Sequence, residues 1–158
     1  MPFIVPLFVN NMSKYFDPAS STYVGIKGDS VPASPGTAKA WAESIKLGSP
    51  SIFPPSVTIS AAESAMYGAL SGWSSNSDSA GSMLKSAIDT FYATYAPGCL
   101  PAFAAVPPSG CPIEQTFATG MSGVPHTAWA TDCGNVIANW ISTGMWTNTS
   151  SGVSGPWI

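Results

Sequence analysis

The longest regular pattern of apolar residues in the chain lies near its centre, between residues 78 and 96. Its apolar members are Met83, Leu84, Ala87, Ile88, Phe91, Tyr92 and Tyr95. They recur every three to four residues, which is the spacing of one face of an α-helix and differs from the two-residue alternation of a strand. The pattern predicts a central helix, and we expect the other helices to pack against it.

Shorter stretches with the same period lie on both sides of this segment. In the second predicted helix, Ser60 and Glu63 have the spacing of a capping box, in which each side chain accepts the other residue's backbone N–H. Pro112 suits the first turn of a later helix, where its missing N–H costs nothing. The sequence thus predicts a mainly α protein of about five helices, at approximately 37–48, 60–71, 78–96, 112–122 and 127–143.

The two ends of the chain lack a helical period and are rich in proline and glycine. Because prolines stand at positions 2 and 6, we expect an extended start. A chain of 158 residues is long enough for one core, so we predict a single domain. Its parts are an extended arm and loop (1–36), a helical core (37–144) and a C-terminal arm (145–158). Packing of the arms on their own core and packing on a neighbouring subunit remain alternatives.

If the arms reach a neighbour, their apolar residues form the interface. These candidate interface residues are Phe3, Ile4, Leu7, Phe8, Trp146, Trp157 and Ile158.

A short sequence pattern occurs twice. Pro-Pro-Ser stands at 54–56 and again at 107–109, and Ser-Gly stands at 71–72 and again at 122–123. A loop and a longer predicted helix follow in both places. The recurrence predicts a helical pseudo-repeat, although turn chemistry shared by unrelated segments explains it nearly as well.

Charged residues are scarce, at 8% of the chain where about 25% is usual, and arginine is absent. Interface cores are depleted in charged residues, so this composition favours a subunit of a larger assembly over an ordinary or secreted domain with an uncharged surface. The net charge is −3 and the five lysines are scattered, which disfavours a nucleic-acid partner. No apolar run reaches the roughly 18 residues of a membrane-spanning helix, so we expect no membrane span.

The sequence contains no recognisable catalytic, metal or cofactor site. His126 is the only histidine and thus the only candidate base for a serine or cysteine nucleophile, and no nucleophile-elbow motif is present. Cys99, Cys111, His126 and Cys133 are separated by 11, 14 and 6 residues, without the close pairs that organise a zinc site. We therefore expect reduced thiols, no cofactor and no enzymatic activity.

The sparse charge, the Pro-Pro-Ser connectors and the closing run from Asn139 to Trp157 resemble the small virion proteins of tailed bacteriophages, of the kind found in tails and baseplates. The resemblance covers about the C-terminal half of the chain. It implies a non-enzymatic structural subunit, assembled in the host cytoplasm and located in the virion, whose partners are copies of itself or other virion proteins. A head–tail connector or a capsid decoration protein would have the same sequence features. The alternative from another class is a small secreted module that binds carbohydrate through exposed tryptophans.

Overall fold

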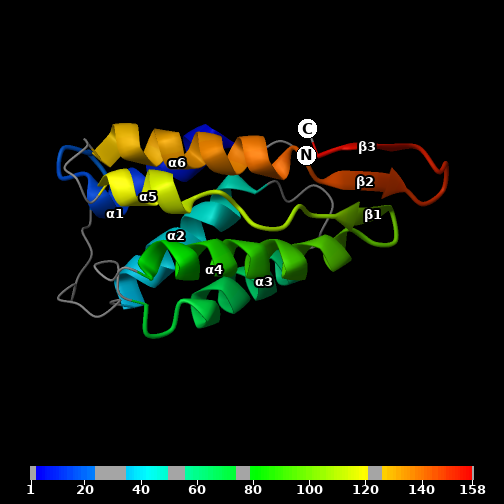
Figure 1. The fold of residues 1–158 in the computed structure, drawn as a ribbon, viewed down its shortest axis with the longest axis horizontal. Coiled ribbons are helices and arrows are strands. Elements are labelled where there is room, and N and C mark those ends of the chain that lie inside the picture. Colours follow the sequence, from blue (N-terminus) through cyan, green and yellow to red (C-terminus); the bar gives the residue numbers. More distant parts are fainter. Residues whose placement is uncertain (1–2, 24–34, 50–55, 74–78, 121–125, 158) are drawn as a thin grey trace.

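A computed structural model describes residues 3–23, 35–49, 56–73, 79–120 and 126–157. Within these ranges the chain forms six α-helices, one 3-10 turn and three short strands (Figure 1). The elements are α1 (Val5–Phe16), α2 (Pro35–Gly48), α3 (Ser56–Ala69), α4 (Ala80–Tyr95), η1 (Ala96–Cys99), β1 (Phe103–Val106), α5 (Glu114–Gly120), α6 (His126–Ile141), β2 (Met145–Asn148) and β3 (Ser154–Pro156). The predicted mainly α class is confirmed.

The five predicted helices correspond to α2–α6, with ends that differ by a few residues. The largest difference is at α3, which begins at Ser56, one turn earlier than predicted. The earlier start brings Ile59 into the core, one turn before Ala62 and two turns before Met66. Ser60 therefore lies inside the helix and the predicted capping box is wrong. The Glu63 carboxylate instead accepts a hydrogen bond from Lys46 at 2.6 Å.

The predicted inner face of α4 is confirmed, because all its apolar residues except the half-buried Met83 are buried. The prediction that the other helices pack on α4 is only partly right. α3 and α5 contact α4, whereas α1 contacts α2 and α6 instead (Figure 1). The helices thus form two groups, one of α1, α2 and α6 and the other of α3 and α4. The groups are linked by the contact of α2 with α3 and by α5, which contacts both α4 and α6.

The predicted extended start is wrong, because residues 5–16 form α1. Pro6 lies in the first helical turn, where no intrahelical N–H donor is needed, so proline there is compatible with a helix. Phe8, Asn11 and Met12 are buried at helical spacing. α1 packs closely on α6 at Gly134, where an added Cβ would lie 3.1 Å from the Phe8 ring.

The predicted irregular C-terminal arm is also replaced by regular structure. β2 and β3 form an antiparallel hairpin, and β1, from the connector after α4, pairs with β2 on its other side. Strands of three or four residues are too short to give a clear two-residue alternation, so sequence patterning missed them. The sheet projects from one end of the helical body (Figure 1).

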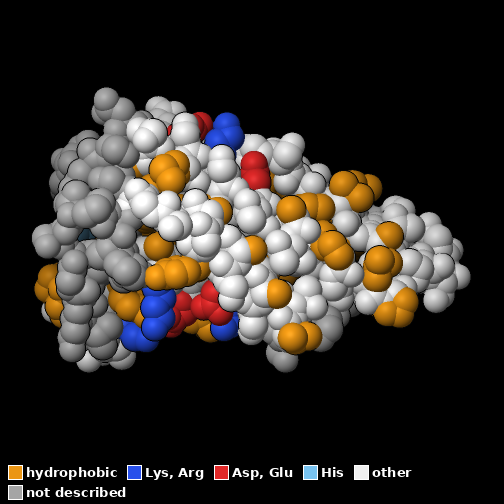
Figure 2. All heavy atoms as spheres, turned by 90° about the horizontal axis from the view of Figure 1, so that it is seen from below, with side chains coloured by type: hydrophobic (Ala, Val, Ile, Leu, Met, Phe, Trp, Pro, Cys, Tyr) orange, Lys and Arg blue, Asp and Glu red, His pale blue; other side chains and the backbone are white. Residues whose placement is uncertain are grey.

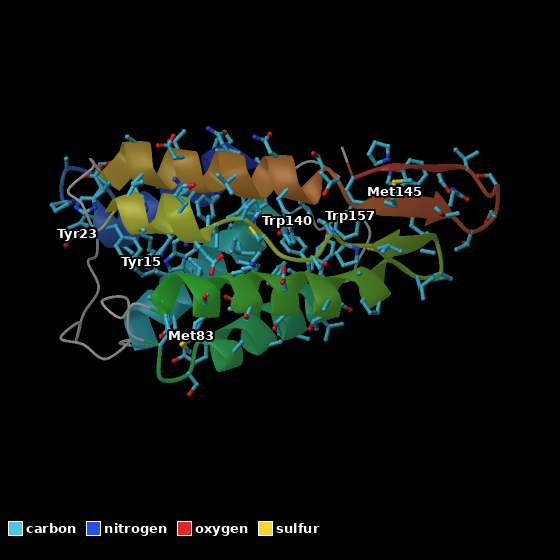
Figure 3. All side chains as sticks on the ribbon, viewed as in Figure 1. Tyr15, Tyr23, Met83, Trp140, Met145 and Trp157 are labelled. Carbon is cyan, nitrogen blue, oxygen red and sulfur yellow. The ribbon has the colours of Figure 1, made fainter. Side chains whose placement is uncertain are left out.

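An aromatic cluster joins the sheet to the helices. Trp157 follows β3 and is only 1% exposed, with its ring centroid 6.3 Å from that of Tyr92 and 6.0 Å from that of Tyr95. The Trp140 ring of α6 also contacts the Tyr92 ring, with the two centroids 5.7 Å apart. The Trp157 indole also donates a hydrogen bond to the Met145 carbonyl at 2.7 Å. Figure 3 shows Trp140 and Trp157 at this junction.

The helix order is compatible with the predicted pseudo-repeat without establishing it. α3 and α4 follow one Pro-Pro-Ser segment, and α5 and α6 follow the other. However, α3 has 14 residues and α5 has 7. The internal duplication stays a prediction.

Candidate interaction surface

Strand register divides the side chains of the projecting sheet between two faces, because residues directly opposite each other on paired strands share a face. Phe103, Ala105 and Trp146 lie on the inner face and pack against the core. The Phe103 and Trp146 rings meet edge to face at 5.6 Å. Gly155 allows this packing, because a Cβ there would lie 3.0 Å from the Trp146 ring.

The other face, called here the outer face, is directed to solvent and consists of two rows that run across the strands. The large row is Val106, Met145 and Pro156, and the small row is Ala104, Thr147 and Ser154. Val106 is 65% exposed and Met145 is 48% exposed. The Thr147 and Ser154 hydroxyls are hydrogen-bonded to each other at 2.7 Å. Figure 3 shows Met145 on the projecting sheet.

The sheet carries no charged side chain. The sequence has none between Asp89 and Glu114, and none after Asp132. In the face shown in Figure 2, the acidic and basic side chains lie over the helical body, and the projecting end has neither. The low overall charge of the chain is therefore unevenly distributed, with one end entirely uncharged.

The helical body, in contrast, carries ion pairs. Among the described residues, Lys14 lies 3.7 Å from Glu43, Lys46 lies 2.6 Å from Glu63, and Lys85 lies 3.5 Å from Glu114. The Tyr15 hydroxyl donates to the Glu43 carboxylate at 2.8 Å. Burial raises the pKa of Tyr15 to about 12, and its hydrogen bond to Glu43 acts in the same direction. The first two pairs and the Tyr15 hydrogen bond connect α1, α2 and α3, and the third pair connects α4 with α5.

A shallow groove of about 250 Å³ lies between α2 and α3. It is lined by Lys39, Ala42, Glu63, Ser64 and Tyr67. Glu63 is already paired with Lys46 at its edge. The groove is open, whereas ligand and catalytic sites are mostly concave pockets that enclose their substrate.

The structure divides the predicted interface residues. Phe3, Phe8 and Trp157 are buried within the chain's own core. Trp146 is half-buried against the core. Ile4 and Leu7 are 37% and 46% exposed, so they remain available to a neighbour. Ile158 lies outside the described residues.

The outer-face residues were not among these predictions. Runs of three or four residues give too short an alternation to show which face each side chain takes. The long uncharged stretches around them were visible in the sequence. The sequence did not show that these stretches meet in one sheet, because β1 and β2 are about 40 residues apart and pair only in the folded chain.

The four candidate zinc ligands do not gather into one site in the part of the chain that the structure describes. His126 is exposed at the start of α6, whereas Cys99, Cys111 and Cys133 are buried free thiols. Burial raises the pKa of the Cys111 thiol to about 12, so it stays protonated and weakly reactive at neutral pH. No group of three or more potential metal ligands occurs in the described ranges.

The tryptophans are also not arranged as an exposed stacking surface. Five of the six are buried, and Trp146 is half-buried. Carbohydrate stacking needs an accessible aromatic face, and the exposed tryptophans that the carbohydrate-binding alternative supposes are not found.

No protein-family model matches the chain, and no significant match to a curated protein or a solved structure was found. Among the described helices, none combines the length and the apolar character needed to cross a bilayer.

Proposed function

We propose that this protein is a non-enzymatic structural subunit, held in a larger assembly through the outer face of its projecting sheet. The observation that carries the proposal is the solvent-exposed apolar row of Val106, Met145 and Pro156 on a sheet without charged side chains. The resemblance to small phage virion proteins leads us to place the assembly in a tail or baseplate. A connector or a decoration protein would use the same kind of contact.

The physical basis is the low cost of covering this surface. A buried charge must be desolvated, which costs several kcal/mol unless it finds a well-placed partner. The outer face has no charged group to desolvate. Its exposed apolar side chains gain about 25 cal/mol for each Å² removed from water. Its strands are also fixed to the body by Trp157 and Trp146, so little conformational entropy is lost on contact.

Incorporation into particles tests the proposal directly. An epitope-tagged chain would be expressed in a culture that produces the particles, which are then purified on a density gradient. Quantitative mass spectrometry should find the wild-type chain at a constant copy number per particle. Absence of the wild-type chain from purified particles would refute the proposed role.

Charge substitutions on the sheet locate the contact. Val106→Glu and Met145→Glu should remove the chain from the particles, because each puts a carboxylate into the covered face. Val153→Glu is the matched control. Val153 is 58% exposed on the same hairpin, and register places it opposite Asn148, on the other face. Equal incorporation of all three variants would show that the outer face is not the contact.

A further inference from the structure

We draw no further inference here: the strongest candidate, the exposed apolar row of Val106, Met145 and Pro156 on the outer face of the projecting sheet, belongs to the surface already described, and nothing in the structure shows what covers it.

Discussion

Replacing Trp157 with alanine tests whether the C-terminal segment belongs to the core of its own chain. The indole is 1% exposed and lies against Tyr92 and Tyr95. Removal of a large aromatic side chain from a core costs about 3–5 kcal/mol. The lost hydrogen bond to the Met145 carbonyl adds about 1 kcal/mol. We expect Trp157→Ala to lower the free energy of unfolding by about 4–6 kcal/mol.

Such a loss is a large share of the roughly 5–15 kcal/mol that stabilises a typical domain. For a chain of this length it corresponds to a fall in melting temperature of about 10–15 °C. Guanidinium denaturation followed by helical circular dichroism measures it. Trp157→Phe keeps an aromatic ring and loses the N–H, so it should cost only about 1–2 kcal/mol. Val153→Ala, at an exposed site, should cost less than about 0.5 kcal/mol.

The reasoning would be refuted by a Trp157→Ala variant within about 0.5 kcal/mol of wild type. That result would mean that the helical body does not need the C-terminal anchor. The last residues would then be an arm that is independent of the core, which is one of the two alternatives that the sequence left open.

Three further predictions concern other parts of the fold. The Trp41 indole N–H is buried without a hydrogen-bond partner. Trp41→Phe removes this unsatisfied donor and should therefore leave the free energy of unfolding within about 1 kcal/mol of wild type. A loss of more than about 2 kcal/mol in urea denaturation would contradict this expectation. The Asp89 carboxylate accepts hydrogen bonds from the Gly110 N–H at 3.0 Å and from the Cys111 N–H at 3.4 Å. Asp89→Asn should therefore lower the free energy of unfolding by about 1 kcal/mol and speed amide hydrogen exchange at Gly110. Unchanged exchange at Gly110 would count against this prediction. The Cys111 thiol has its pKa raised by burial from 9.0 to about 12, so an unfolded chain loses this proton at lower pH than the folded chain. The stability that the buried neutral thiol contributes is complete below about pH 9 and is lost at up to about 1.4 kcal/mol per pH unit as the pH rises towards 12. A urea midpoint that stays constant from about pH 8 to about pH 10.5 would refute this prediction. Cys111→Ala should make the midpoint fall less steeply with pH.

The surface of the uncharged sheet was indicated only indirectly by the amino-acid sequence. Scarce charge indicated an interaction surface, but its place depended on which uncharged segments meet. In the fold, residues 103–106 and 145–156 come together and extend beyond the helical body. The residues of the candidate contact are thus brought together only by strand pairing. The register also determines that Val153, the matched control, lies on the other face of the sheet.

Helical segments were predictable because each carries its own signal. The inner face of α4 recurs at 3.6-residue spacing over four turns, so Leu84, Ile88 and Phe91 could be assigned to a core without knowledge of what covers them. The same holds for α2 and α6. In these helices, helix formation and burial of one face in the core require the same spacing of apolar residues.

The two ends depended on tertiary contacts. Pro6 alone does not distinguish an extended start from a first helical turn, and the packing of Phe8 against α6 at Gly134 stabilises the helix. The strands of the C-terminal hairpin have only three or four residues, and such short strands are not stable alone in water. They form because β1 is supplied from a distant segment and Trp157 is buried against Tyr92 and Tyr95. The sequence by itself therefore determined where most helices form, whereas the three-dimensional fold decided which residues anchor the ends and which remain exposed, because those outcomes depend on contacts between segments far apart in the chain.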